Sequence, residues 1–377
     1  MGNNRIYLSP PHMSGKEIEF VQDAFKSNWI APLGPYVNKF EKDIESYLGT
    51  NHCAVLSSGT AAIHLALILS GVKANDFVIC PSFTFSATAN PILYQNATPV
   101  FVDSELDTWN MDPDLLRNAI EFCLNRGKKP RAIILVHLYG MPCKLSELLQ
   151  IANEYQIPVI EDAAESLGSK YDNQHTGTFG KFGILSFNGN KIITTSGGGA
   201  LICEDETAIE KSKFLATQSR DHALHYQHSE IGYNYRMSNI CAAIGCGQME
   251  VLEKRISQRR KNFQFYEEQL STIPGISFLA EQPKNFSNRW LTTILLNPLI
   301  TKKSNLEIIS ALEKHNIESR PLWKPLHLQP VFEPFPSILN GNSEVLFNSG
   351  LCLPSGSSLH HEKLSEICKI IKNQFLD

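Results

Sequence analysis

Between about residue 50 and residue 205, short apolar runs alternate with segments that have the period of a helix. The clearest run, Arg131–His137, is almost entirely apolar, as expected of a strand whose two faces are both covered. Such alternation predicts an α/β fold, with a central, mostly parallel sheet between helices. The predicted strands are 52–56, 76–80, 98–102, 131–137, 158–161, 184–187 and 200–203.

Beyond about residue 250 the pattern changes. A long helical stretch is followed by a strand-like run at Trp290–Leu296 and by a helix that carries Ile308 and Leu312. A last amphipathic helix places Leu364, Ile367, Ile370 and Ile371 on one face. We therefore predict a large domain at residues 1–250, which includes the N-terminal segment, and a smaller α+β domain at residues 251–377.

The charge and composition exclude several classes of protein. The 377-residue chain has a net charge of −4 and no long run of Lys or Arg, so we expect no nucleic-acid partner. No apolar run is long enough to span a bilayer, and Met1–Pro10 lacks the apolar core of a signal peptide. The nine cysteines form no C-x-x-C pair and several have apolar neighbours, which predicts a reduced, cytoplasmic protein.

One lysine stands in an unusual position. The apolar run Ile184–Phe187 leads into a small polar turn, and Lys191 lies beside the glycine-rich stretch Ser196–Gly199. A desolvated lysine amine can form a Schiff base with a carbonyl compound. The alternative is an ordinary lysine on a surface hairpin.

A second stretch favours the chemical interpretation. The apolar run that begins at Val159 brings Asp162 to its carboxyl end, where ligands bind in open α/β sheets. A pyridoxal 5'-phosphate (PLP) enzyme needs a lysine for the Schiff base and an acid for the pyridine nitrogen. Glu161 and Asp162 do not form a glycosidase-like pair, because adjacent strand residues point to opposite faces.

Two further segments fit the same cofactor. The strand that ends at Leu56 runs into Ser57–Ala62 and then a helix, an arrangement that can bind a phosphate at the helix N-terminus. The alternative is a plain helix cap by Ser58. Phe85 can lie against a flat ring, or it can simply pack in the core.

Three histidines raise the question of a metal site. His222, His225 and His228 are spaced so that they fan around a helix, and no carboxylate or cysteine completes a set of ligands. We therefore predict no metal site and place these histidines in a loop near the active site.

The order of these motifs resembles the sugar-nucleotide aminotransferases of the DegT/DnrJ/EryC1/StrS family. The resemblance covers nearly the whole chain and is carried by SSGTAA at 57–62, PSFTF at 81–85, EDAAE at 161–165, GNK at 189–191 and GYNYR at 232–236. It implies the aspartate aminotransferase fold (PLP-dependent fold type I). Within the family the chain looks most similar to the UDP-N-acetylbacillosamine-pathway 4-aminotransferases, through LSPPHMSG at 8–15, NWIAPLGP at 28–35, NRWL at 288–291 and RPLWKPLH at 320–327.

The resemblance also implies a role for each matching residue. Lys191 binds PLP, Asp162 pairs with its pyridine nitrogen and Phe85 stacks on its ring. The residues implied for its phosphate are Gly59, Thr60, Ser186 and, from a second subunit, Asn234. The residues implied for the UDP-sugar are Asn28, Trp29, Ile30, Ala31, Arg320, Trp323 and His327. A homodimer with shared active sites is expected, because Asn234 serves the neighbouring site.

Glu165 departs from the common pattern of the family. Many members carry glutamine at this position, near the PLP hydroxyl group, whereas members of the bacillosamine branch carry glutamate. A carboxylate there repels the phenolate oxygen unless it is protonated or turned away.

Together these features predict a transaminase that moves an amino group from L-glutamate to C4 of a UDP-4-keto-6-deoxy-N-acetylhexosamine. The product would be UDP-4-amino-4,6-dideoxy-N-acetylglucosamine. One alternative is an aminotransferase for another keto-sugar nucleotide, with a 3-keto group or the other C4 epimer. A second alternative is a non-catalytic sugar-nucleotide-binding protein, and the intact lysine, acid and phosphate turn argue against it.

Overall fold

The computed structural model describes residues 5–50 and 52–376, and an eight-stranded sheet forms its centre. Met1–Asn4 and Asp377, the ends of the two predicted domains, lie outside the described residues. The strands of this sheet are β1 His52–Leu56, β2 Phe77–Pro81, β3 Thr98–Val102, β4 Ala132–Val136, β5 Val159–Asp162, β8 Phe182–Ser186, β9 Gly199–Cys203 and β14 Ser337–Ile338. Seven of them match the predicted strands to within two residues at each end.

The strand order across the sheet is β1-β9-β8-β5-β4-β2-β3-β14. All neighbours from β8 to β14 are parallel, whereas β9 is antiparallel to both β1 and β8. The mostly parallel sheet predicted from the alternating pattern is therefore confirmed.

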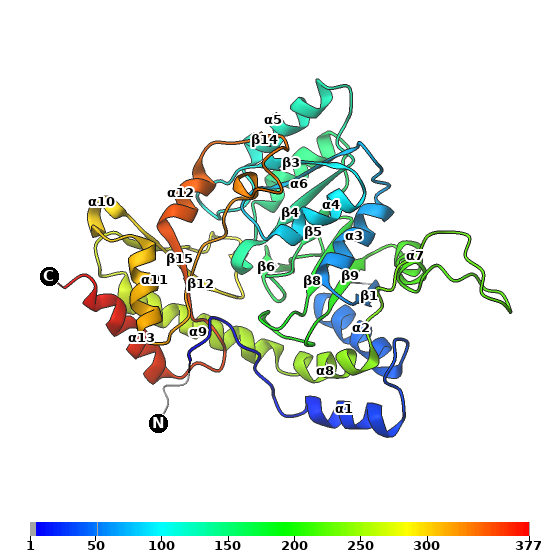
Figure 1. The fold of residues 1–377 in the computed structure, drawn as a ribbon, viewed down its shortest axis with the longest axis horizontal. Coiled ribbons are helices and arrows are strands. Elements are labelled where there is room, and N and C mark those ends of the chain that lie inside the picture. Colours follow the sequence, from blue (N-terminus) through cyan, green and yellow to red (C-terminus); the bar gives the residue numbers. More distant parts are fainter. Residues whose placement is uncertain (1–4, 51, 377) are drawn as a thin grey trace.

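Helices cover both faces of this sheet (Figure 1). On β4, Ile134 packs in the cluster under α3, while Ile133 and Leu135 pack in the cluster under α5 and α6. This two-sided burial explains why β4 is apolar at every position. The helices on one face are α3 Gly59–Leu69, α4 Asn90–Tyr94 and α7 Glu206–Ala216, and those on the other are α2 Pro35–Leu48, α5 Pro113–Leu124, α6 Leu145–Glu154 and α8 Asn239–Met249. Helix α1 Glu17–Lys26 packs on α8.

A second, antiparallel sheet lies toward the C-terminal end of the chain, with the order β10-β12-β15-β13. Its strands are β10 Ile276–Phe278, β12 Thr292–Leu296, β13 Arg320–Pro321 and β15 Gly350–Leu353. It packs with α9 Leu252–Leu270, α11 Asn305–Lys314 and α13 His361–Asn373, and the short helices here are α10 Pro298–Thr301 and α12 Asn342–Ser349. The six apolar residues predicted to share helix faces in this region are all buried.

Two segments cross the predicted boundary between the domains. β14 pairs with β3 at the edge of the large sheet, although it lies far beyond residue 250. Ile6 forms a parallel bridge with Ile317, so the N-terminal segment contacts the C-terminal part of the chain. The division at residues 250 and 251 stays a prediction. A small third sheet joins β11 Asn285–Phe286, β6 Lys170–Tyr171 and β7 Gln174–His175.

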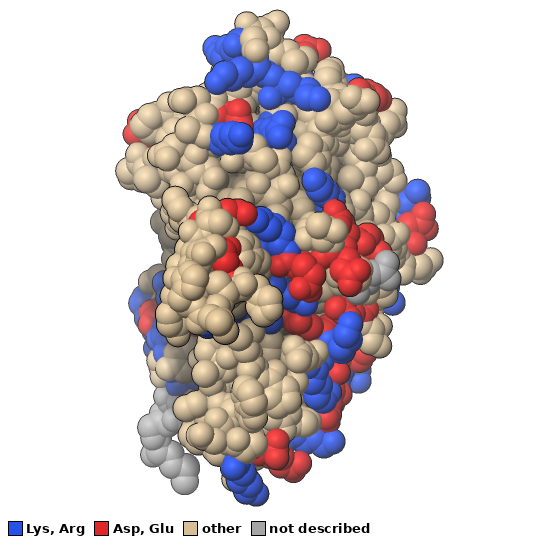
Figure 2. Space-filling view, turned by 90° about the vertical axis from the view of Figure 1, so that its right-hand side faces the viewer, with Lys and Arg blue, Asp and Glu red and all other residues tan. Residues whose placement is uncertain are grey.

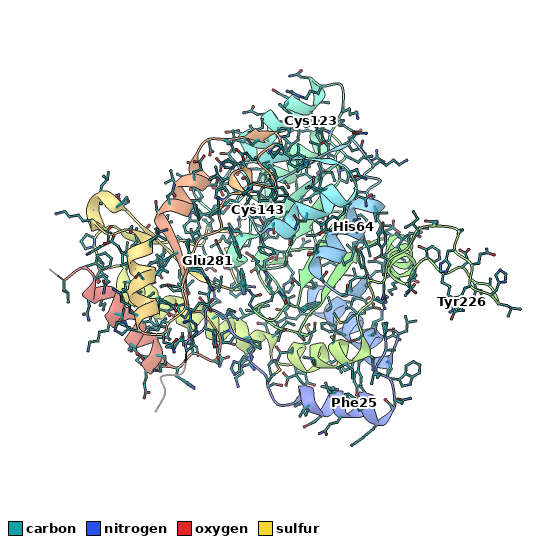
Figure 3. The ribbon with its side chains drawn as sticks, in the orientation of Figure 1. Phe25, His64, Cys123, Cys143, Tyr226 and Glu281 are labelled. Atoms are coloured by element: carbon teal, nitrogen blue, oxygen red, sulfur yellow. The ribbon has the colours of Figure 1, made fainter. Side chains whose placement is uncertain are left out.

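Between α7 and α8 a long loop projects from the body of the protein (Figure 1). Leu224, Tyr226 and Ile231 on this loop are strongly exposed, and Figure 3 shows Tyr226 far out along it. Within the described part of the chain, no helix is both long enough and apolar enough to cross a membrane.

Candidate active site

A cavity of about 380 Å³ opens where β5 and β8 end and α3 begins. Eight of the predicted site residues line this single cavity: Gly59, Thr60, Phe85, Asp162, Glu165, Ser186, Lys191 and Trp323. They come from segments that are distant in the sequence, and the carboxyl ends of the parallel strands bring them together. The lysine and the acid thus face the same enclosed space.

The Lys191 side chain is directed into this cavity and is only 12% exposed. Its amine lies 4.2 Å from the ring centroid of Trp290 and 3.5 Å from Oε1 of Glu165. The preceding carbonyl, of Asn190, accepts hydrogen bonds from Ser9 Oγ at 2.6 Å and from Trp290 Nε1 at 2.7 Å. This arrangement rules out the alternative of a surface-hairpin lysine.

Asp162, the last residue of β5, is buried at the floor of the cavity. The Thr88 hydroxyl donates to its Oδ2 at 2.7 Å, and the Ala164 N–H donates to its Oδ1 at 3.2 Å. Burial raises the pKa of Asp162, although both hydrogen bonds and the charge of Lys191 oppose this effect. A bound cation beside the carboxylate would favour its charged form.

Glu161 points to the other side of the strand, as the alternation of strand side chains predicted. Its carboxylate accepts N–H groups from Gly177, Phe179 and Gly180, and it lies 2.9 Å from His137 Nε2. Glu161 is fully buried and does not line the cavity of Asp162. Its hydrogen bonds secure the turn at residues 177–180, which leads into β8.

Glu165 is also buried, and its Oε2 accepts the Tyr139 N–H at 2.7 Å. Burial raises the pKa of Glu165, while the nearby Lys191 amine and the Tyr139 N–H oppose the shift. The carboxyl group is thus held beside the lysine and is poised to be neutral at a higher pH than an exposed glutamic acid.

The turn at the start of α3 is tightly packed against β8 and β9. Ser58 caps the helix by accepting the Ala61 N–H at 3.0 Å, so the helix cap predicted as the alternative for this turn is present. A Cβ on Gly59 would lie 3.2 Å from the Ser186 Cβ, and one on Gly199 would lie 2.4 Å from the Gly59 nitrogen. The small residues therefore bring the helix N-terminus to the cavity, where it can also receive an anion.

No motif in the sequence predicted the stack of aromatic rings beside the cavity. Tyr139 lies between Trp290 and Trp323, at centroid distances of 6.4 and 6.3 Å, and is nearly parallel to both rings. The backbone N–H of Trp323 donates to the Tyr139 hydroxyl at 2.9 Å. Phe85 is half exposed, and its ring centroid lies 5.3 Å from that of Trp323. The hydrogen bond from Thr88 to Asp162 was not predicted either. Both Tyr139 and Thr88 follow the carboxyl ends of strands, and this position in the sequence is the feature that could have predicted their place near the cavity.

A second cavity, of about 760 Å³, adjoins the first and shares Asn190, Trp290 and Trp323 with it. The N-terminal segment Tyr7–Pro11 lines one part of it. The predicted substrate residue Arg320 also lines it and pairs with Glu318 at 3.0 Å. Two of the predicted substrate residues, Arg320 and Trp323, thus lie next to the lysine cavity.

The remaining predicted residues line neither cavity. Asn28–Ala31 and Asn234 are exposed. His327 contacts Ser82 Oγ at 2.7 Å and Glu344 at 3.3 Å, the surroundings of a structural histidine. The roles of these residues in binding substrate or cofactor stay predictions.

The three histidines lie on the projecting loop between α7 and α8. His225 contacts Gln227, and His228 contacts the Gln218 carbonyl. Among residues 5–50 and 52–376, no three His, Cys, Asp or Glu side chains are grouped in a way that could hold a metal ion. The absence of a metal site in the protein stays a prediction.

Comparison with known proteins gives consistent matches over nearly the full chain. Residues 11–372 match the model of the DegT/DnrJ/EryC1/StrS aminotransferase family. EpsN of Bacillus subtilis, assigned as a pyridoxal phosphate-dependent aminotransferase, is 52% identical over 99% of this chain and 96% of its own. GDP-perosamine synthase of Escherichia coli O157:H7 is 36% identical over 99% of both chains. Spr1654 of Streptococcus pneumoniae, assigned as a sugar aminotransferase and solved in its PLP form, matches with a TM-score of 0.89 and 28% identity over 98% of both chains.

Proposed function

The chain belongs to the DegT/DnrJ/EryC1/StrS aminotransferase family, and we propose that its acceptor is a UDP-4-keto-6-deoxy-N-acetylhexosamine. It is a sugar aminotransferase, and its cofactor is PLP. In the proposed reaction L-glutamate gives up its amino group and takes an oxygen from water to become 2-oxoglutarate. The C4 ketone of the sugar takes up the amino group and loses its oxygen as water, so no water is gained or lost overall. The product is UDP-4-amino-4,6-dideoxy-N-acetylglucosamine, a bacillosamine precursor for a surface glycan. The observation that carries this proposal is the lysine–acid cavity, which shares Asn190, Trp290 and Trp323 with a second cavity of sugar-nucleotide size.

The residues of the smaller cavity fit PLP. Its volume of about 380 Å³ and its mixed lining suit a flat aromatic ring with one phosphate. Lys191 would hold the aldehyde carbon, Asp162 the ring nitrogen and Phe85 one ring face, while Gly59 and Thr60 at the helix N-terminus would meet the phosphate. When bound, PLP supplies an electron sink for the carbon that loses its proton.

The protein's own part in the reaction is to hold and move protons. Asp162 keeps a positive charge on the ring nitrogen as long as it is ionised itself, and Thr88 and Ala164 favour the ionised form by donating to it. The Lys191 amine, held over Trp290, is placed to take a proton from the amino donor's carbon and to return it. Glu165 lies 3.5 Å from that amine and can exchange a proton with it.

The larger cavity is the proposed site of the nucleotide. Arg320 is placed at its wall, where a guanidinium can pair with a diphosphate. Trp323 lies at the boundary of the two cavities and can contact the sugar.

We propose a homodimer in which each chain completes its partner's site. Asn28–Ala31 and Asn234 are exposed and line neither of these two cavities, and a second copy of the chain is where they would act. Trp29 and Ile30 are about half exposed, and Figure 2 shows that uncharged side chains cover much of the face from which the α7–α8 loop projects. Exposed apolar side chains such as those of Trp29 and Ile30 favour burial in an interface. We also propose a cytoplasmic location, which fits the nine free cysteines.

A GDP-linked keto-sugar is the second candidate acceptor. The 36% identity to a GDP-perosamine synthase over nearly the whole of both chains favours it. The two candidates differ in the nucleotide base and in the acetamido group of the sugar, so the larger cavity must distinguish them.

Incubation with L-glutamate and each keto-sugar nucleotide in turn tests the proposal. We expect the UDP-linked N-acetyl sugar to give a 4-amino product, whose C4 configuration is read by NMR, and 2-oxoglutarate in equal amount. Lys191→Ala should lose both the absorption band of lysine-bound PLP and turnover. Faster turnover of the GDP-linked sugar, by kcat/KM, would replace the proposed acceptor with the second candidate.

A further inference from the structure

Arg259, on α9, is a fully buried arginine that meets no acid. Its side chain is 1% exposed, and it forms no ion pair within the part of the chain that is described. Burial, together with the nearby Arg255, lowers the pKa of Arg259 to about 9. Burying a guanidinium without a carboxylate costs desolvation free energy, so its hydrogen bonds must offset that cost.

Those hydrogen bonds join two segments that are otherwise far apart in the sequence. Nη1 donates to the Trp290 carbonyl at 2.5 Å, and Nη2 donates to Ser9 Oγ at 2.9 Å. Trp290 lies two residues before the start of β12, and Ser9 belongs to the N-terminal segment that lines the larger cavity. Arg259 therefore ties both segments to α9 through its two hydrogen bonds.

Both partners of Arg259 then converge on one atom beside the catalytic lysine. Ser9 Oγ and Trp290 Nε1 each donate to the Asn190 carbonyl, which belongs to the peptide that precedes Lys191. The Trp290 ring also lies 4.2 Å from the Lys191 amine. A shift of Ser9 or Trp290 would thus move the lysine backbone and remove the surface on which its amine rests.

We propose that Arg259 is a positioning residue, which sets the place of the Lys191 amine by holding Ser9 and Trp290 against the Asn190 carbonyl. The inference rests on the proposed role of Lys191. Removal of the guanidinium leaves the Trp290 carbonyl without this donor in a buried site, and an unsatisfied buried group is costly enough to drive rearrangement. Small displacements of reacting groups lower rates strongly, because catalysis depends on alignment.

Arg255 provides a matched control on the same helix. It lies one turn before Arg259, is 3% exposed and also binds the N-terminal segment, through the His12 carbonyl at 2.9 Å. Its hydrogen bonds go to His12 and Gln258, and neither residue contacts the Asn190 carbonyl in place of Ser9 or Trp290. Loss of Arg255 should therefore loosen the chain at His12, while Arg259 still holds Ser9 and Trp290 and the lysine keeps its place.

The test compares Arg259→Met with Arg255→Met in full-length protein labelled with 5-fluorotryptophan. The chain has four tryptophans, so the fluorine spectrum contains four signals, and Trp290→Phe assigns one of them. In the PLP-free protein, Arg259→Met should shift the Trp290 signal, whereas Arg255→Met should leave it in place. This readout needs neither cofactor nor sugar, so it does not depend on whether the proposed acceptor is correct.

Kinetics of the PLP-loaded protein with L-glutamate provide the second readout. Arg259→Met should lower kcat by at least about tenfold with a smaller change in KM, and Arg259→Lys, which keeps one cationic donor, should recover part of the loss. Ser9→Ala removes one of the two donors to Asn190 and should act in the same direction more weakly, which keeps the test open if Arg259→Met does not fold. An unchanged Trp290 signal with wild-type kcat in Arg259→Met, or equal effects in Arg255→Met, would overturn the proposal.

Discussion

The hydrogen bond from Thr88 to Asp162 allows a quantitative test of how the cofactor is held. Both residues are buried, and the Thr88 hydroxyl donates to Oδ2 at 2.7 Å. Burial already raises the pKa of Asp162, and this donor opposes the rise. Thr88→Val keeps the side-chain shape and removes the donor, so the pKa of Asp162 should rise further. A protonated Asp162 cannot hold a protonated ring nitrogen, and PLP affinity should fall.

The size of the effect follows from the charge of the acceptor. A hydrogen bond to a charged group contributes about 1.5–3 kcal/mol. Since about 1.4 kcal/mol corresponds to a factor of ten, Thr88→Val should weaken PLP binding by about ten- to a hundredfold. The loss should grow as the pH falls, because the neutral form of Asp162 is then more populated.

Titration of the PLP-free protein with PLP, followed by the absorption of the lysine-bound form at several pH values, measures this effect. Thr84→Val is the matched control, because Thr84 lines the same cavity and its hydroxyl contacts that of Thr88 at 3.0 Å, whereas the donors to Asp162 are Thr88 and Ala164. It should change PLP affinity by less than about threefold. Equal affinities of Thr88→Val and wild type across the pH range would refute the reasoning, as would an equal loss in Thr84→Val.

Three further changes test other parts of the site. Asp162→Asn should cut turnover by orders of magnitude, since it removes the charge opposite the ring nitrogen; a near-normal rate of product formation would contradict this role. Glu165→Gln removes an acid whose pKa is raised by burial. Such an acid contributes to the free energy of unfolding at low pH, and this contribution is lost as the pH rises through the folded-state pKa. The PLP-free variant should therefore lose less thermal stability than wild type between acidic and neutral pH, and parallel melting-temperature profiles would count against the shift. Arg320→Ala should raise KM for the sugar nucleotide about tenfold while PLP affinity is kept, because Arg320 lines only the larger cavity; an unchanged KM would place the diphosphate elsewhere.

The arrangement of the residues proposed to hold the cofactor could be predicted because it follows a rule that is local in the sequence. An apolar run predicts a strand, and in a parallel sheet the residues at the carboxyl ends of neighbouring strands meet at one edge. This places Asp162 at the end of β5 and Ser186 at the end of β8 in the same cavity, with the turn before α3 opposite them. The opposite orientations of Glu161 and Asp162 follow from strand alternation alone.

The supports of these residues could not be predicted in the same way. Tyr139 lies between Trp290 and Trp323, and no periodicity links three aromatic residues so far apart in the chain. Its backbone has a positive φ of 54°, and its N–H donates to Glu165 Oε2 at 2.7 Å. β14 gives no recognisable strand signal, because its two residues become a strand only by pairing with the free edge of β3.

The sequence by itself therefore determined the layered sheet, the lysine and acid that face one cavity, and the family to which the chain belongs. Tertiary structure alone decided how the lysine is held, through Arg259, Ser9 and Trp290, and how the N-terminal segment comes to line the larger cavity. The physical reason is one of range. The periodic pattern of apolar residues reflects the burial of each element against its sheet. The hydrogen bond between Arg259 and Ser9 joins residues 250 positions apart, and no periodicity in the sequence predicts it.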